Sequence, residues 1–122
     1  MFSESEVKEI ASDIASEYTG ELIEHPENIT IKLCSGRKEM YIEWPKHDLA
    51  EVWMTFIQDG EDLYQDWFEC MESEDKREFV QYVRSIPNKF FSQEVRVKRH
   101  GLIFRRYILE SKHESGWGNI FE

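Results

Sequence analysis

The sequence contains very little cysteine. Cys34 and Cys70 are the only two in 122 residues, which is too few for the disulfide framework that supports many small secreted domains. No histidine has a second histidine or a cysteine at metal-ligand spacing, so the pattern indicates no metal site. Glycine-rich phosphate loops and nucleophile motifs are also missing. We therefore expect no enzymatic activity and no cofactor.

Long apolar runs are missing as well. No stretch approaches the roughly 20 apolar residues that cross a bilayer. The N-terminus, MFSESEVKEI, lacks the basic region followed by an apolar segment that marks a secretory signal. We expect a cytoplasmic protein that does not bind membranes.

Basic residues are outnumbered, with 15 Lys and Arg against 25 Asp and Glu, which gives a net charge of −10. The charge is divided into blocks. Residues 1–27 hold eight acidic residues against Lys8, residues 48–78 hold eleven against two bases, and residues 79–112 hold eight bases against two acidic residues. A chain with this net charge repels polyanions such as nucleic acids.

Length and pattern predict a single α+β domain over residues 1–122. Ser3 with Glu6 fits a capping box, and alternation of apolar and polar residues predicts strands. The expected elements are an N-terminal helix over 3–18, a hairpin over about 29–44, helices over about 48–58, 61–71 and 74–86, and a hairpin over about 94–109. We expect both hairpins in one sheet packed against the central helices. The tail, 111–122, is either mobile or held by Trp117 and Phe121.

The central stretch supports two interpretations. Leu49, Val52, Trp53 and Phe56 recur at helical spacing, as do the apolar residues after Asp62. Asp59-Gly60 between two apolar segments is, however, the strongest short hairpin signal. As strands, residues 51–57 would be apolar on both faces, so we favour two helices.

The stretch from Asp48 to Glu78 has the composition of a protein-binding surface. Large aromatics run through its acidic residues, and such aromatics are frequent at the centres of interfaces. A solvated face with its aromatics turned into the core is the simpler interpretation, but it explains the crowding of like charge less well. The candidate partner-binding residues are Asp59, Glu61, Asp62, Tyr64, Asp66, Trp67, Glu69 and Glu72.

A basic hairpin follows and offers a second candidate site. Basic residues beside aromatics can bind single-stranded nucleic acid through phosphate contacts and stacking. The same residues can also neutralise the chain's own acidic segments or meet the acidic block of a second copy in a homodimer. The residues are Arg96, Lys98, Arg99, Arg105 and Arg106.

A small acidic chain with the run DGEDLYQDW over residues 59–67 and no catalytic motif resembles the immunity proteins of bacterial toxin systems, including contact-dependent inhibition. The resemblance is one of overall character. It implies a basic protein partner, the nuclease domain of a toxin, whose active site is blocked by carboxylates in place of phosphates. The alternatives are an anionic mimic of nucleic acid that inhibits a DNA-binding enzyme, and a nucleic-acid-binding module on the basic hairpin.

Overall fold

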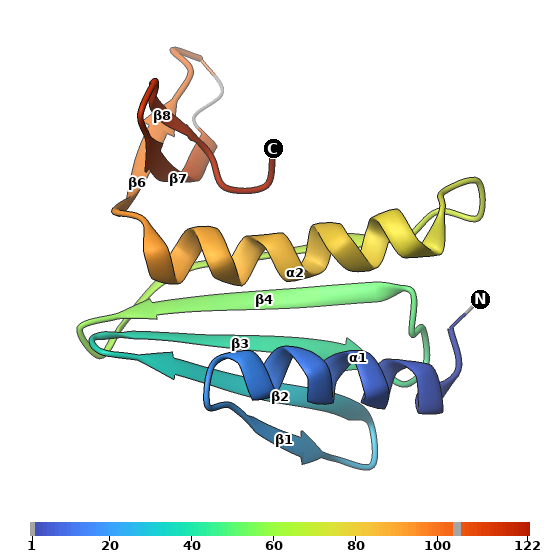
Figure 1. Ribbon diagram of the computed structural model, residues 1–122. Coiled ribbons are helices and arrows are strands. Elements are labelled where there is room, and N and C mark those ends of the chain that lie inside the picture. Colours follow the sequence, from blue (N-terminus) through green and yellow to red (C-terminus); the bar gives the residue numbers. More distant parts are fainter. Residues whose placement is uncertain (1, 104–105) are drawn as a thin grey trace. The chain divides into compact units, whose positions relative to one another are not determined.

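Two antiparallel sheets and two helices make up the chain, which divides into two units, Met1–Gln81 and Tyr82–Glu122 (Figure 1). The computed structural model describes residues 2–103 and 106–122. The predicted α+β class is confirmed. The predicted arrangement of two hairpins in one sheet is wrong, because the strands belong to one five-stranded and one three-stranded sheet.

The five-stranded sheet buries one of its two faces. Its strands, in the order β1-β2-β3-β4-β5, are β1 (Glu21–Glu24), β2 (Asn28–Ser35), β3 (Lys38–Pro45), β4 (Glu51–Gln58) and β5 (Glu61–Glu69). Alternate residues of the three central strands share the buried face, where Ile31, Ile42 and Met54 lie in one row across neighbouring strands. We call this the inner face, and the other side of the sheet the outer face.

Helix α1 (Glu4–Glu17) begins at the predicted capping box. The backbone N–H of Glu6 donates to Ser3 Oγ, and the N–H of Ser3 donates to Glu6 Oε1. The helix packs against β1 and β2 (Figure 1) and buries its apolar stripe, which confirms the predicted N-terminal helix. The buried residues are Val7, Ala11, Ile14 and Ala15. Strand β1 lies between the predicted N-terminal helix and the predicted hairpin over about 29–44, where no strand was predicted.

The two helices predicted over 48–58 and 61–71 are wrong, because these residues form the hairpin β4–β5. Asp59 and Gly60 have φ of 54° and 78°, the positive values that a tight hairpin turn requires. Strand β4 is indeed apolar on both faces, since Val52, Met54 and Phe56 are buried while Trp53 lies opposite Trp67 on the outer face. The hairpin is stabilised because β4 also pairs with β3. This pairing joins residues far apart in the sequence, so the local spacing of apolar residues does not reveal it.

Helix α2 (Lys76–Ser92) is longer than the predicted 74–86 and contains Pro87. Asp75 caps it, since Asp75 Oδ1 accepts from the backbone N–H of Arg77 at 2.8 Å and of Glu78 at 3.2 Å. Phe79, Val83, Ile86 and Phe90 are buried at helical spacing. The apolar stripe therefore continues past Pro87 and favours a helix beyond the proline.

The second unit contains a three-stranded sheet in the order β6-β7-β8, formed by β6 (Val95–His100), β7 (Arg106–His113) and β8 (Gly116–Asn119). Strand β8 and the residues after it belong to the tail segment. Tyr82 Oη donates to the backbone oxygen of Phe121, and Lys89 Nζ donates to the backbone oxygen of Ile120 at 3.3 Å. Among the described residues, neither helix is long and apolar enough to cross a membrane.

The turn after α1 generates a stability prediction. Gly20→Ala should lower the free energy of unfolding by about 1–3 kcal/mol, because the added Cβ would lie 2.6 Å from Leu33 Cδ2 and 2.9 Å from Lys32 O. Thr19→Gly should raise it by about 1 kcal/mol, because Thr19 has a φ of 54°. Urea denaturation followed by circular dichroism measures both values. Changes of the same sign would contradict this account of the turn.

Candidate functional site

The outer face of the five-stranded sheet carries a stacked pair of tryptophans. Trp53 on β4 lies directly opposite Trp67 on β5, with ring centroids 5.7 Å apart and planes inclined by 22°. Trp53 Nε1 donates to Glu51 Oε1 at 3.0 Å, which fixes the orientation of the Trp53 ring. Trp67 keeps 48% of its surface exposed although it stacks on Trp53. The stack is thus a rigid, half-exposed aromatic surface at the edge of the sheet.

Carboxylates surround this stack. Glu43 lies opposite Trp53 on the side away from Trp67, and Glu51 lies opposite Glu69. Like charges directly opposite each other in a sheet are destabilising. The carboxylate of Glu51 accepts from Trp53 and lies 3.7 Å from His47 Nε2. The Glu69 side chain is exposed and forms no ion pair with any residue in the described ranges.

The eight predicted partner-binding residues all lie in or beside the β4–β5 hairpin, but they do not share one face. Trp67 and Glu69 are on the outer face. Tyr64 and Asp66 lie opposite Phe56 and Met54 on the inner face, where Tyr64 Oη donates to Asp66 Oδ2 at 3.4 Å. The others lie at the two ends of β5: Asp59 in the turn, Glu61 and Asp62 at the start, and Glu72 beyond the end.

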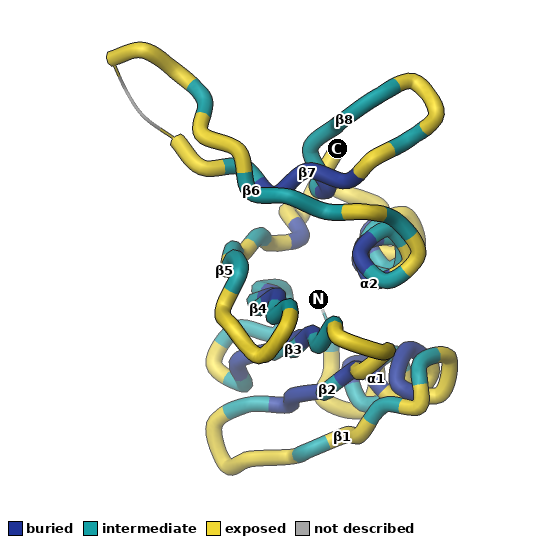
Figure 2. The backbone as a smooth tube through the Cα atoms, turned by 90° about the vertical axis from the view of Figure 1, so that its left-hand side faces the viewer, coloured by how far each residue is buried: buried dark blue, intermediate teal, exposed yellow. Residues whose placement is uncertain are grey.

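Strand β5 is an edge strand and is more exposed than its neighbours. It pairs with β4 alone, and none of its residues is buried. Figure 2 shows β5 in yellow and teal, whereas β2 and β3 contain dark blue, buried stretches. We define the β5 acidic surface as Glu61, Asp62, Trp67, Glu69 and Glu72, all of which are exposed.

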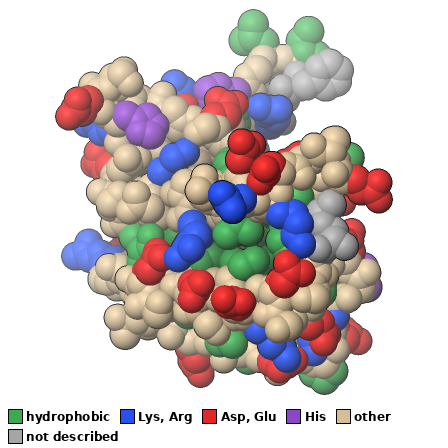
Figure 3. Space-filling model, turned by 45° about the vertical axis from the view of Figure 1, so that its right-hand side comes forward, with side chains coloured by type: hydrophobic (Ala, Val, Ile, Leu, Met, Phe, Trp, Pro, Cys, Tyr) green, Lys and Arg blue, Asp and Glu red, His purple; other side chains and the backbone are tan. Residues whose placement is uncertain are grey.

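The two acidic blocks differ in how their charge is compensated. In the N-terminal block, Lys8 Nζ lies 2.8 Å from Glu24, Lys46 Nζ lies 3.0 Å from the same carboxylate, and Lys76 Nζ lies 2.9 Å from Glu6. The side of the molecule drawn in Figure 3 shows Lys and Arg side chains interspersed with Asp and Glu.

These lysines lower the pKa values of two of the carboxylates that they contact. The hydrogen bond from Lys8, followed by that from Lys46, lowers the pKa of Glu24, and the hydrogen bond from Lys76 lowers the pKa of Glu6. No such pairing stabilises the β5 acidic surface. Within residues 2–103 and 106–122, its four carboxylates form no ion pair. Asp59, in the β4–β5 turn, lies 3.7 Å from Arg37 of the β2–β3 turn, and both side chains are largely exposed.

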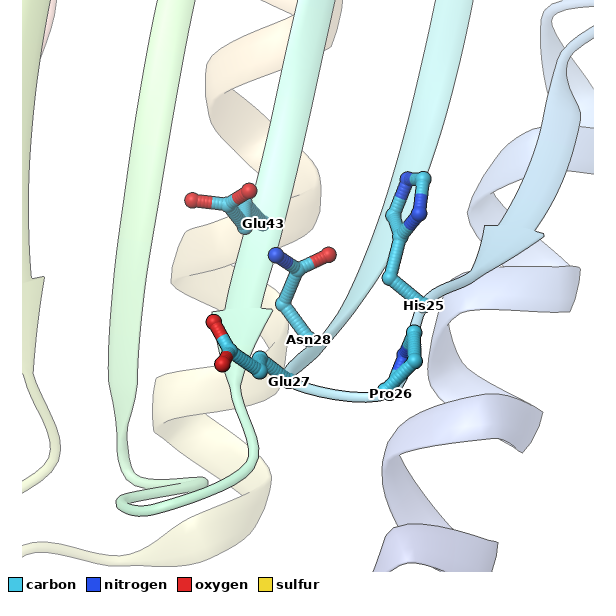
Figure 4. Close-up of a pocket in the computed structure, with 5 residues that line it drawn as sticks. All are labelled: His25, Pro26, Glu27, Asn28 and Glu43. Atoms are coloured by element: carbon cyan, nitrogen blue, oxygen red, sulfur yellow. The ribbon is translucent and has the colours of Figure 1, made fainter.

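Two pockets open beside this region. One of about 350 Å³ is lined by His25, Pro26, Glu27, Asn28 and Glu43, with Asn28 lying between Glu43 and His25 (Figure 4). Asn28 Oδ1 accepts from Thr30 Oγ1 at 2.9 Å, which orients its amide. The second, of about 260 Å³, is lined by Thr55 of β4 and by residues 62–65 of β5, which include Asp62. Both present carboxylates, so a cationic side chain is the group they accommodate best.

Part of the alternative basic site already forms contacts within the chain. Arg96 Nε donates to Glu110 Oε1 at 2.9 Å, and its guanidinium lies 4.1 Å from the Trp117 ring centroid. Lys98, Arg99 and Arg106 are exposed, but Arg99 lies on the opposite face of the sheet from Arg96 and Lys98. Arg105 lies outside the described residues.

No three His, Cys, Asp or Glu side chains in the described part of the chain are grouped so that they can hold a metal ion. Both cysteines are free. Cys34 is exposed, whereas Cys70 is buried, and burial raises the pKa of its thiol.

Sequence reasoning missed the contribution of β3 and β4 to this surface, namely Tyr41, Glu43 and the stacking of Trp53 on Trp67. The alternation of Trp53 and Thr55 with Val52, Met54 and Phe56 is typical of a strand with two different faces. It predicts a strand here only if Asp59-Gly60 is interpreted as a hairpin turn. The chain matches no protein-family model, and neither the curated proteins nor the solved structures contain a match to it.

The ion pairs of Glu24 and Glu6 predict acid sensitivity. A carboxylate whose pKa is lowered on folding stabilises the fold above its ordinary value of 4.5 and loses this effect as the pH falls through the folded pKa. We expect the thermal midpoint of unfolding to fall below about pH 4.5 and the fall to be smaller in Glu24→Gln. Glu9→Gln, which changes an exposed carboxylate on α1, should keep the wild-type profile. Identical profiles for Glu24→Gln and wild type would refute the role of Glu24.

Proposed function

We propose that this chain is a non-enzymatic binding protein that inhibits a cationic, nuclease-type toxin, as bacterial immunity proteins do. The β5 acidic surface would meet the partner, and the Trp53–Trp67 stack would be its apolar anchor. The observation that carries the proposal is the contrast between the acidic blocks. Lysines neutralise Glu4, Glu6 and Glu24 within the chain, while the four carboxylates of the β5 acidic surface form no ion pair among the described residues.

The inhibition would work by occlusion. A nuclease groove carries Lys and Arg that bind phosphates, and carboxylates on an edge strand present negative charge at similar reach. Desolvation by the tryptophan pair would strengthen these ion pairs, because charges attract more strongly where water is excluded. The pockets beside Asp62 and Glu43 would accept individual cationic side chains. The carboxylates and the ring thus supply charge and apolar contact at one site.

The nucleic-acid alternative receives less support from the contacts. Arg96, the base nearest to Trp117, already pairs with Glu110. The remaining exposed bases, Lys98, Arg99 and Arg106, lie on both faces of the sheet rather than along one groove. An anionic mimic of nucleic acid shares the physics of the proposal, but its binding would be broad and would depend on salt throughout.

Capture from a lysate of the source cell tests the proposal. The immobilised chain is washed at about 50 mM and then about 500 mM salt, because salt screens charge pairs and leaves an apolar contact intact. We expect one basic protein to remain after the second wash and its nuclease activity to be inhibited by the soluble chain. A crowd of basic proteins released together by salt would support the mimic. Retained nucleic acid would support the module on the basic hairpin.

The captured protein then allows a test of the carboxylates. Asp62→Ala with Glu69→Ala should weaken its binding at least about 30-fold, because losing one partner of a desolvated charge pair costs about 2–5 kcal/mol. Titration calorimetry measures the dissociation constants. Glu9→Ala with Asp13→Ala removes the same charge from an exposed face of α1 and should change binding little. Equal losses from the two double variants would sink the assignment to β5.

The aromatic anchor has a separate test. Trp67→Ala should release the captured protein in the high-salt wash, because truncation of a central aromatic typically costs about 2 kcal/mol or more. Trp117→Ala, which removes a tryptophan from the second unit, is the matched control and should leave retention unchanged. Retention of the partner by the Trp67 variant at high salt would show that the anchor lies elsewhere.

A further inference from the structure

Each of the two sheets ends in a charged edge strand. Strand β5 has β4 as a neighbour on one side, and β6 has β7 on one side; no described strand pairs with the other side of either. The free side of an edge strand presents backbone N–H and C=O groups that can pair with a strand of another chain. Neither strand contains proline, and no residue of either is buried.

The two edges carry opposite charge. Strand β5 has Glu61, Asp62, Asp66 and Glu69 and no basic residue. Strand β6, with the sequence VRVKRH, has Arg96, Lys98 and Arg99 and no acidic residue. Lys98 and Arg99 are exposed, as are Asp62 and Glu69. Pairing of β5 with another β5, or of β6 with another β6, would place like charges side by side, which is unfavourable. The other acidic edge, β1 (Glu21–Glu24), has its Glu24 paired with Lys8 and Lys46 within the chain, so a β5–β6 pair is the combination that opposite charge favours most.

We propose that the chain self-associates by addition of β6 of one copy to β5 of a second copy. The backbone groups of the two edges would supply the hydrogen bonds, and the carboxylates of β5 would face the cations of β6. Each copy carries one β5 and one β6, so two copies together offer two such contacts. This inference goes beyond the proposed toxin partner and does not depend on it.

An exposed apolar segment directly after β6 fits the same role. Leu102 and Ile103 expose 98% and 86% of their surface, which is far more than a large aliphatic side chain usually keeps in water. Both follow, within three residues, the strand that would add to β5. Aliphatic side chains do not stack on bases as aromatics do, so they favour a protein surface over nucleic acid as the neighbour of this hairpin.

Sedimentation velocity of the full chain tests the proposal. At about 20 mM salt we expect a dimer, and at about 500 mM salt a shift towards monomer, since the Debye length falls about fivefold. Glu61→Lys, Asp62→Lys and Glu69→Lys together make β5 basic, with three Lys against Asp66, and Lys98→Glu with Arg99→Glu makes β6 acidic, with two Glu against Arg96. In each variant the two edges then carry the same sign, so the dissociation constant at low salt should rise at least about tenfold.

An equimolar mixture of the two variants is the decisive sample. The basic β5 of the first then faces the acidic β6 of the second, and the acidic β5 of the second faces the basic β6 of the first. We expect each variant to be monomeric alone and the mixture to form a heterodimer. Circular dichroism of each variant confirms that it is folded.

A control and two outcomes complete the test. Glu9→Lys, Asp13→Lys and Glu17→Lys together change the net charge as the β5 variant does, but on α1, and should leave the dimer intact. A wild-type chain that is monomeric at low salt overturns the proposal, as does a mixture that stays monomeric. Capture of a basic protein by the wild type in either case would leave the proposed function standing, so the two failures are distinguishable.

Discussion

Burial of one face of the five-stranded sheet determines where the other side chains of its strands lie. Ile31, Ile42 and Met54 form one buried row across β2, β3 and β4. Because side chains alternate along a strand, this row places Trp53 on the outer face, opposite Trp67. A one-residue slip of β4 would turn Trp53 inward and expose Met54, so the core maintains the register on which the aromatic stack depends.

Electrostatics then separates the two acidic blocks. The N-terminal block has lysines within reach, and Glu24 alone is bonded by Lys8 and Lys46. The β5 acidic surface lies on an edge strand, where the neighbouring residues of β4 opposite it are mostly uncharged and one, Glu51, is acidic. Self-repulsion at this edge lowers the stability of the isolated chain. A cationic ligand would relieve it, whether that ligand is a toxin or the β6 strand of a second copy.

The sequence was most informative where local chemistry decides structure. The capping box of Ser3 and Glu6 and the stripe of α1 were predictable because both depend on residues within a few positions. The hairpin at Asp59-Gly60 was visible but outweighed by helical spacing, since the partner strand β3 is absent from any local window. The predicted helix stops at residue 86, directly before Pro87, although the buried stripe continues to Phe90. The acidic candidates were found, but their division between two faces required the register.

The central claim is that the β5 carboxylates are uncompensated within the chain, and the unfolding free energy of the isolated protein tests it most directly. Asp62→Asn with Glu69→Gln removes two charges at constant shape and can be compared with Glu24→Gln by urea denaturation at low salt and neutral pH, at a protein concentration at which sedimentation velocity shows a monomer. The account predicts that the β5 variant is more stable than wild type and that Glu24→Gln is less stable. A β5 variant that is less stable than wild type would show that these carboxylates have partners within the chain, and would contradict the account.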